Sequence, residues 1–295
     1  MRDSWWKRWV CAVRPWTLPA AIAPVVLGTA MAFGDGAGRW TPAISAMIVA
    51  VLIQTGTNFV NDIADFQRGA DTDERTGPVR VIQAGLISKQ LLIQTAVIVF
   101  ALAILIGLWI VMKQQAWLLI PLGASCILAG VLYTAGPVPA AYLGLGDVMV
   151  IVFFGPVAVS GTYYLQALSV SWTSVFAGLG CGLICCGILV VNNYRDYDVD
   201  KRVDKKTLPV RFGRSFARWE YVGLMSAAVI MSLLVAIVAQ RPGVLLSLIA
   251  VAASIPAVRL LFSMQSIPQD LNRALSYTGR ILVLYALFFG IGWLI

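Results

Sequence analysis

The carboxylates of this chain are concentrated in two short segments. Nine of its 14 acidic residues lie there, and asparagines stand just before the aspartates in both segments. The first segment contains Asn58, Asn61, Asp62, Asp65, Asp71, Asp73 and Glu74, and the second contains Asn192, Asn193, Asp196, Asp198, Asp200 and Asp204. This recurrence indicates a weak internal repeat that supplies two similar clusters of oxygen ligands.

On a helix, at about 100° per residue, one asparagine and two aspartates of each segment fall on one face. These sets are Asn58, Asp62 and Asp65, and Asn192, Asp196 and Asp200. Because like charges on one face repel each other, we expect a cation to offset them. Oxygen ligands suit Mg²⁺ or Mn²⁺, with phosphate completing the coordination. We predict that Asp62, Asp65, Asp196 and Asp200 are catalytic metal ligands, oriented by Asn58, Asn61, Asn192 and Asn193.

Basic residues accompany both clusters. Arg80 follows the first, and the second is followed by Lys205, Lys206 and Arg211. Cationic side chains around Mg²⁺ are typical of a diphosphate site. We therefore predict these four residues as a diphosphate clamp, and Arg195 as a further substrate-binding residue. A solvated charged face at a membrane surface is the alternative interpretation, but it does not explain the recurring asparagine–aspartate pairs.

The composition is that of a membrane protein. The 295 residues are 59% apolar and 12% charged, with a mean hydropathy of +0.83, whereas soluble domains are about half apolar and a quarter charged. The chain has no histidine. This absence excludes Ser-His and Cys-His catalytic pairs and histidine-ligated metals.

Nine apolar stretches long enough for transmembrane helices must position the two clusters. They are residues 18–33, 41–60, 91–112, 117–133, 148–165, 174–191, 221–238, 244–262 and 281–295, the last starting near 277 if it spans fully. We predict one all-α transmembrane domain, residues 1–295, around a cytoplasm-facing cavity, with aspartate-rich segments at about 58–89 and 192–218. Gly180, Gly182 and Gly187 in the sixth stretch indicate close helix packing.

The basic residues predict the orientation. With nine spans, 19 of the 22 Lys and Arg residues lie on one side, and the positive-inside rule places that side in the cytoplasm. We therefore expect a multi-pass protein of the cytoplasmic (inner) membrane, with the N-terminus and the active site on the cytoplasmic side. The net charge of +8 then follows from topology and does not indicate a nucleic-acid partner.

Two motifs resemble the UbiA superfamily of intramembrane aromatic prenyltransferases. Asn61-Asp62-Ile63-Ala64-Asp65, with Asp71 beyond it, and Asp196-xxx-Asp200 are similar to the paired aspartate-rich motifs of that family. Further stretches resemble the branch that acts on 1,4-dihydroxy-2-naphthoate. These are Arg14-Pro15-Trp16-Thr17, Gly77-Pro78-Val79-Arg80, Gly144-Leu145-Gly146-Asp147 and Asn192-Asn193-Tyr194-Arg195-Asp196. Asp204 departs from the glycine that is usual in the branch before the lysine.

The resemblance implies Mg-dependent transfer of a polyprenyl group from polyprenyl diphosphate to 1,4-dihydroxy-2-naphthoate. Diphosphate and carbon dioxide would be lost, giving demethylmenaquinone. Metal ions and fixed cations stabilise the leaving diphosphate, while a cavity in the lipid bilayer excludes water from the allyl cation. Asp147, near Tyr133 if the fourth and fifth helices form a hairpin, is expected to hold or deprotonate a naphthoate hydroxyl. A simple interfacial acid is the alternative reading of Asp147.

Two other kinds of function stay open from the sequence. The acceptor could be 4-hydroxybenzoate, homogentisate or a haem vinyl group. A protein of another class, an ion-coupled transporter, also buries carboxylates. Its carboxylates are expected near the bilayer midplane, however, whereas both clusters here lie at the predicted cytoplasmic ends of spans.

Overall fold

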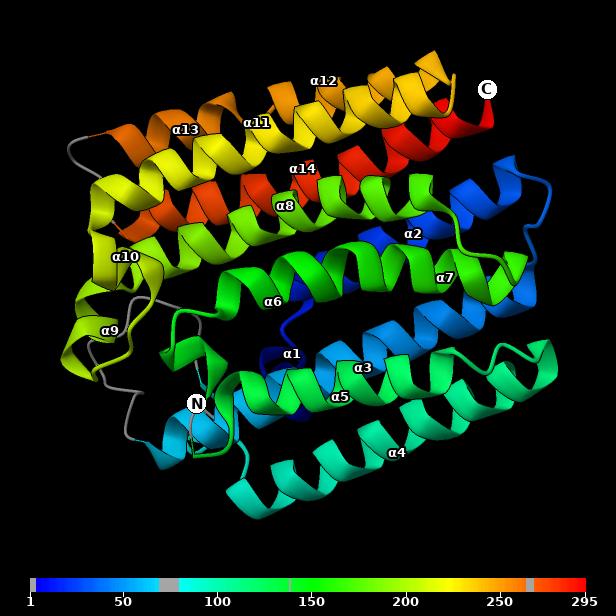
Figure 1. Ribbon diagram of the computed structural model, residues 1–295. Helices are drawn as coiled ribbons and strands as arrows, with labels where there is room; N and C mark the ends of the chain where they lie inside the picture. The colour runs from blue at the N-terminus through cyan, green and yellow to red at the C-terminus, as the bar shows by residue number, and fades with distance from the viewer. Residues whose placement is uncertain (1–3, 69–79, 138, 264–267) are drawn as a thin grey trace.

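The computed structural model describes residues 4–68, 80–137, 139–263 and 268–295, and within these ranges the chain forms helices and no strands (Figure 1). The elements are α1 (Trp5–Val13), η1 (Pro15–Thr17), α2 (Leu18–Gly34), α3 (Trp40–Gln67), α4 (Lys89–Gln114), α5 (Leu119–Thr134), η2 (Ala140–Tyr142), α6 (Gly146–Val152), η3 (Phe153–Val157), α7 (Ala158–Ala167), α8 (Trp172–Arg195), α9 (Tyr197–Arg202), α10 (Leu208–Phe212), α11 (Arg214–Val238), η4 (Pro242–Leu246), α12 (Ser247–Ala252), α13 (Ile255–Phe262) and α14 (Pro268–Leu294).

The described helices confirm the all-α membrane architecture. Eight of the nine predicted spans fall in helices, or in runs of consecutive helices such as α1 to α2, α6 to α7 and η4 to α13, that are long and apolar enough to cross a membrane. The fourth predicted span is α5, which has 16 residues and is therefore about 24 Å long at 1.5 Å per residue. Because the hydrocarbon core is about 30 Å thick, the length of α5 does not establish a ninth crossing. The count of nine stays a prediction.

Several helix boundaries differ from the predicted ones. α14 begins at Pro268 and has 27 residues, so the last span starts earlier than the apolar stretch indicates. The fifth span is interrupted by the π-helical turn η3, where Gly155 leaves helical geometry next to Pro156. Proline lacks an N–H and clashes with the preceding turn, which accounts for this irregular segment.

α8 is the central helix of the bundle, packed against α11, α14 and η3 (Figure 1). In the apolar stretch of α8, 67% of the residues are buried, whereas in the apolar stretch of α4 only 22% are buried. The protein core is therefore built around α8, and α4 lies at the periphery with most of its apolar side chains exposed. In a membrane, lipid would cover that exposed surface of α4.

Small residues let α8 approach η3 closely, as the glycines of the sixth stretch indicated. A Cβ atom placed on Gly182 would lie 2.9 Å from the Cα atom of Gly155, and one on Gly178 would lie 2.8 Å from that of Pro156. These distances leave no room for a side chain, because backbone rather than a movable side chain stands in the way. Glycine is thus required at this contact, which fixes α6 and α7 against the core.

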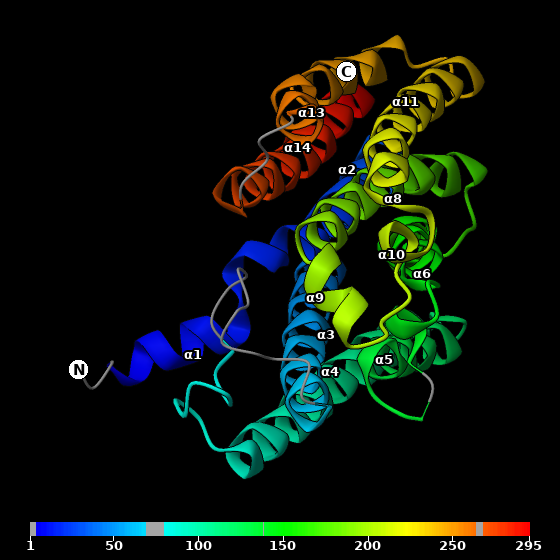
Figure 2. The ribbon, with the colours of Figure 1, turned by 90° about the vertical axis from the view of Figure 1, so that its left-hand side faces the viewer.

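The described aspartates of the two clusters lie at the same end of the bundle. Asp62 and Asp65 lie in the last turns of α3, and Asp196 lies where α8 passes into α9. Two views show α9, α10 and the C-terminal end of α3 together at this end (Figures 1 and 2). The helices therefore bring together clusters that are far apart in the sequence.

We predict that Gly182→Ala lowers the melting temperature of the detergent-solubilised protein. Overpacking a tight contact costs about 1–3 kcal/mol, and here the added methyl group would meet the backbone of η3 and α6. Gly223→Ala in α11 is the matched control, because nothing lies within 4 Å of a Cβ atom at that position. Thermal unfolding followed by fluorescence measures both variants. Equal melting temperatures for the two would contradict the packing argument.

Candidate active site

Arg80 lies against both carboxylates of the first cluster. Its Nη1 is 2.5 Å from Asp62 Oδ1, and its Nη2 is 2.5 Å from Asp65 Oδ2. The side chains of Arg80 and Asp62 are 8% and 1% exposed, so water screens this ion pair only weakly. The structure thus brings Arg80 together with two predicted metal ligands. Its contact with a diphosphate stays a prediction.

The two asparagines of the first cluster join α3 to neighbouring segments. Asn58 Nδ2 donates hydrogen bonds to the carbonyl of Val13 and to Thr17 Oγ1, each over 2.9 Å. Asn61 Oδ1 accepts a hydrogen bond from Thr134 at the end of α5. These bonds hold the α1–η1 corner and α5 against the turns of α3 that carry the aspartates.

Arg14, for which the sequence predicted no role, forms an ion pair with Asp62. Arg14 follows α1 with a φ of 55°, a left-handed conformation that residues other than glycine rarely adopt. Such backbone persists where surrounding contacts hold it, often at functional sites. Here the hydrogen bonds of Asn58 hold the residues on either side of the corner. The stretch Arg14-Pro15-Trp16-Thr17 resembles the naphthoate branch, but its position in the sequence does not indicate that Arg14 lies beside Asp62.

Asp196 is held by the residue that precedes it. Arg195 Nε is 2.8 Å from Asp196 Oδ1, and Arg195 Nη2 is 2.9 Å from Oδ2, the bidentate arrangement of strong arginine–carboxylate pairs. The same guanidinium donates to Asn192 Oδ1 over 2.7 Å and to Asn272 Oδ1 of α14 over 2.9 Å. Arg195 therefore orients Asp196, while its predicted contact with substrate stays a prediction.

The second cluster does not lie on one continuous helix, in contrast to the expectation from its spacing. α8 ends at Arg195 and α9 begins at Tyr197. Even so, the backbone N–H of Asp200 donates to the carbonyl of Asp196 over 2.8 Å, and that of Asp196 donates to Asn192 over 3.0 Å. The four-residue spacing is therefore kept across the break.

Lys205 connects the two clusters. Its Nζ lies 3.3 Å from Asp200 Oδ1, and it interacts electrostatically with Asp65 and Asp196 as well. Burial acts to lower the pKa of Lys205, but these three carboxylates outweigh burial and raise the pKa above its ordinary value. Lys205 is therefore a cation at neutral pH that is influenced by carboxylates of both clusters.

Lys206 and Arg211 lie at a junction between two loops. The Arg211 guanidinium donates to the carbonyls of Lys206 and Leu143 over 3.1 and 2.7 Å. The backbone N–H of Lys206 donates to the carbonyl of Tyr142 over 3.2 Å. These bonds dock the loop between α5 and α6 onto the loop between α9 and α10. The Lys206 ammonium group lies 3.8 Å from the carboxylate of Asp204. Contact of Lys206 or Arg211 with a diphosphate stays a prediction.

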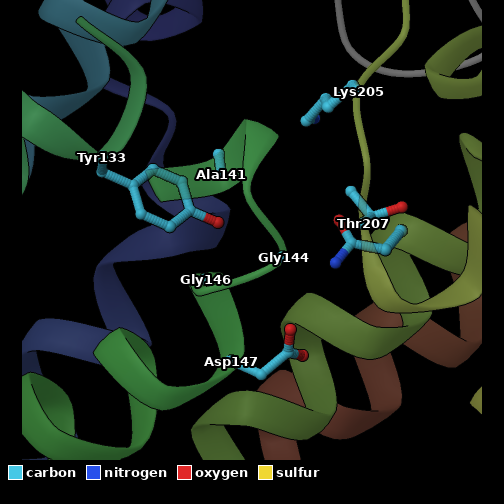
Figure 3. Close-up of a pocket in the computed structure, with 8 residues that line it drawn as sticks. Tyr133, Ala141, Gly144, Gly146, Asp147, Lys205 and Thr207 are labelled. Carbon is cyan, nitrogen blue, oxygen red and sulfur yellow. The ribbon is translucent and has the colours of Figure 1, made fainter. Parts of the chain in front are cut away.

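A small inner pocket lies between these elements (Figure 3). Its lining consists of Tyr133, Ala141, Gly144, Gly146, Asp147, Asn193, Lys205 and Thr207. The structure thus brings Tyr133 of α5 and Asp147 of α6 to one pocket, together with Asn193 and Lys205 from the second cluster. Asp147 is 6% exposed and accepts a hydrogen bond from Cys186 Sγ over 3.5 Å. The cavity measures about 10 Å³, the space of about one water molecule.

The chemistry of the donors fits a hard divalent cation. The four predicted ligands and the side-chain carbonyl of Asn192 all offer oxygen, and Mg²⁺ usually takes only one or two carboxylates. Within the described ranges, no three acidic or cysteine side chains converge closely enough to hold a metal ion by themselves. Asp71, Asp73 and Glu74 lie outside the described residues. A substrate phosphate would therefore complete the coordination.

Comparisons with a family model and with curated proteins point to the same family. Residues 21–277 match the model of the UbiA prenyltransferase family. The chain is 44% identical to the 1,4-dihydroxy-2-naphthoate octaprenyltransferase of Mycobacterium tuberculosis, with 75% of each chain covered. It is 33% identical to the protein of the same name from Haemophilus influenzae, with 98% of this chain and 96% of that one covered.

The fold is also similar to that of solved membrane proteins. A UbiA homolog from Archaeoglobus fulgidus, bound to GPP and Mg²⁺, has a TM-score of 0.69 and 17% identity, covering 97% of this chain and 99% of that one. At this identity the likeness concerns the fold. It confirms the all-α membrane architecture predicted from the apolar stretches.

We predict opposite effects of Arg80→Ala on two ligands. Because Arg80 competes with a metal ion for Asp62 and Asp65, its removal should strengthen Mn²⁺ binding in the absence of substrate. Binding of a prenyl diphosphate should weaken about ten- to a hundred-fold, since a desolvated charge-assisted contact worth about 1.5–3 kcal/mol is lost. Electron paramagnetic resonance of Mn²⁺ and a binding assay with labelled prenyl diphosphate measure the two effects.

Lys7→Ala is the control for this prediction, because Lys7 is an exposed basic residue of α1. It should change neither affinity. If Arg80→Ala and Lys7→Ala leave prenyl diphosphate binding equally unaffected, Arg80 contributes only to topology.

Proposed function

The chain belongs to the UbiA prenyltransferase family, and on that premise we propose that it transfers a polyprenyl group from polyprenyl diphosphate to 1,4-dihydroxy-2-naphthoate. The products are diphosphate, carbon dioxide and demethylmenaquinol, the reduced form of demethylmenaquinone. The observation that carries the proposal is the position of Lys205, which interacts with carboxylates of both clusters and lines the pocket of Asp147. A diphosphate site and an acceptor site can therefore share one wall. The names of the relatives support the naphthoate as acceptor.

The diphosphate is bound where cations stand beside the two clusters. The four aspartates predicted as ligands would hold Mg²⁺, or Mn²⁺, which supplies positive charge to the leaving diphosphate. Arg14, Arg80 and Lys205 hold its oxygens as the allylic C–O bond breaks and negative charge grows on them. Arg195 and the asparagines already hold Asp196, the α1–η1 corner and the end of α5 in place before the substrate binds.

Asp147 acts on the acceptor in the inner pocket. It accepts a hydrogen bond or a proton from a naphthoate hydroxyl, so that electron density moves into the ring. The ring carbon that carries the carboxylate bonds to the prenyl carbon, and diphosphate leaves with the electron pair of the C–O bond. The acceptor carboxylate departs as carbon dioxide, and its bonding pair restores the aromatic ring. Tyr133 and Asn193 orient the acceptor from the pocket wall.

We assign the reaction to the cytoplasmic side of the cytoplasmic (inner) membrane. With nine spans, 19 of 22 basic residues lie on the side that carries both aspartate-rich segments, as the positive-inside rule requires for a cytoplasmic face. The lipid bilayer receives the polyprenyl tail and keeps water away from the allyl cation.

The two alternative functions, an ion-coupled transporter and transfer to a different aromatic acceptor, are not equally supported. Family membership makes the protein an enzyme, which argues against the ion-coupled transporter. A different aromatic acceptor, such as 4-hydroxybenzoate or homogentisate, would use the same diphosphate site. The relatives named for the naphthoate favour that acceptor over both.

The test of the function is a transfer assay with purified protein, Mg²⁺, labelled polyprenyl diphosphate and each of the three aromatic acids. We expect a labelled quinol lipid and release of carbon dioxide with 1,4-dihydroxy-2-naphthoate. Product with another acid alone would overturn the acceptor assignment, and no product with any acid would overturn the function.

The same assay tests the metal. Excess EDTA should abolish turnover, and Asp62→Asn and Asp196→Asn should each lower it by orders of magnitude, because each removes a ligand charge while keeping the side-chain shape. Asp198→Asn is the matched control, since the Asp198 side chain is 69% exposed and pairs with Arg214. Full turnover in EDTA, or equal rates for all three variants, would reject the metal site.

We predict that Asp147→Asn lowers prenyl transfer about 10²- to 10⁴-fold, the contribution that a positioned base typically makes. Metal-dependent binding of polyprenyl diphosphate should stay nearly unchanged. Single-turnover kinetics and a separate binding assay measure the two quantities. Loss of diphosphate binding would place Asp147 in the metal site, whereas normal turnover would leave it a simple interfacial acid.

A further inference from the structure

A second, larger pocket opens beside the inner one. We call it the outer pocket. Its walls include Arg68, Pro137, Pro139, Tyr142, Asp204 and Lys206. It lies between the loop from α5 to α6 and the loop from α9 to α10, where the sequence predicted no separate site. Its cavity measures about 280 Å³, close to the lower end of the range of about 300–1,000 Å³ for small-molecule sites.

The two pockets share a partition. Lys205 lines the inner pocket and Lys206 the outer one, and in the facing loop Ala141 lines the inner pocket and Tyr142 the outer one. The Lys205 ammonium group lies 6.0 Å from the centre of the Tyr142 ring. The pairs Ala141–Tyr142 and Lys205–Lys206 thus separate the two pockets. A small shift of the contact between these two loops would join the pockets.

The side chains of the outer pocket suit an aromatic carboxylate. The Arg68 guanidinium lies over the Tyr142 ring at 4.9 Å, and its Nη atoms donate to the carbonyls of Thr134 and Gly136, each over 2.5 Å. These contacts hold the Arg68 guanidinium in place, and Lys206 supplies a second positive charge to the pocket. Prolines and the tyrosine ring offer flat apolar surface to an aromatic ring, while the two cations attract its carboxylate.

Asp204 opposes that attraction. Its φ is 52°, a conformation that glycine adopts without strain, and its carboxylate lies 3.8 Å from the Lys206 ammonium group. Asp204 is exposed and lines the same pocket. The aspartate at this position therefore puts a competing anion next to the cation that an incoming carboxylate would use.

Size decides the order in which the two pockets would be occupied. The inner cavity has room for about one water molecule, whereas the outer cavity measures about 280 Å³. A bicyclic aromatic acid can thus enter the outer pocket as the loops stand. It can reach Asp147 only when the partition moves.

We propose that the outer pocket is a receiving site for aromatic carboxylates, where Lys206 and Arg68 bind the acceptor before it passes the Tyr142–Lys205 partition, and that Asp204 weakens this binding. The proposal rests on the proposed prenyl transfer to an aromatic acid. It gives Lys206 to the acceptor, in place of the diphosphate contact predicted from the sequence.

The first experiment measures the Michaelis constant for the naphthoate acceptor at saturating polyprenyl diphosphate. Lys206→Ala should raise this constant about three- to five-fold, the range that an exposed ion pair provides, and Asp204→Gly should lower it by a similar factor. The Michaelis constant for polyprenyl diphosphate should stay unchanged in both variants. Lys201→Ala is the matched control, because Lys201 is an exposed lysine of α9 outside the pocket lining.

The second experiment measures binding of 2-naphthoate to the full chain by isothermal titration calorimetry, in EDTA and without polyprenyl diphosphate. The dissociation constant should rise in Lys206→Ala and fall in Asp204→Gly, whereas that of uncharged 2-naphthol should not respond. Higher salt should reduce the differences.

The outcomes separate this inference from the proposed function. Normal transfer with both constants insensitive to residues 204 and 206 overturns the receiving site and leaves the function standing. A higher Michaelis constant for polyprenyl diphosphate in Lys206→Ala, with that for the acceptor unchanged, returns Lys206 to the diphosphate clamp. Binding of 2-naphthoate that depends on Lys206, without any prenyl transfer, supports the pocket and rejects the function.

Discussion

The constraint on which the structure depends is that carboxylates at the end of a membrane helix need positive partners. Asp62 is 1% exposed, and an unpaired charge so poorly solvated would be strongly destabilising. Arg14 and Arg80 both pair with Asp62 Oδ1. The left-handed corner after α1, and the hydrogen bonds of Asn58 that hold this corner, follow from the need to bring a guanidinium to that carboxylate.

The second cluster meets the same constraint through Arg195, the residue that directly precedes Asp196. α8 is the most buried helix of the bundle, so it fixes the position of Arg195 at its last turn, and Arg195 in turn fixes Asp196. Asn272 of α14 accepts from the same guanidinium, which ties this cluster to the last helix. The glycine contact between α8 and η3 also fixes α6, and with it Asp147. Packing in the core therefore determines the distances at the polar end.

The sequence predicted what depends on local pattern. Apolar stretches located the long helices, and the spacing of aspartates and asparagines located both clusters. The start of α14 was missed because Asp270, Asn272, Arg273 and Arg280 break the apolar stretch, although tertiary contacts keep that segment helical. The contact between Arg14 and Asp62 also escaped prediction, since it depends on where the chain turns after α1. Side-chain partners at long range were therefore the least accessible part of the site.

The pairing of the clusters also decides how anions can approach. Two unit charges at 4 Å interact by about 1 kcal/mol in water and about 4 kcal/mol near a protein surface, so bare aspartates would repel both a diphosphate and an aromatic carboxylate. Asp62, Asp196 and Asp200 each have a cationic partner in the structure. A site paired in this way is close to neutral before ligands arrive. When a metal ion binds a carboxylate, the released guanidinium or ammonium group can turn to the phosphate oxygens. The positive charge of the metal ion and the negative charge of the diphosphate then each find a partner of opposite sign in the site.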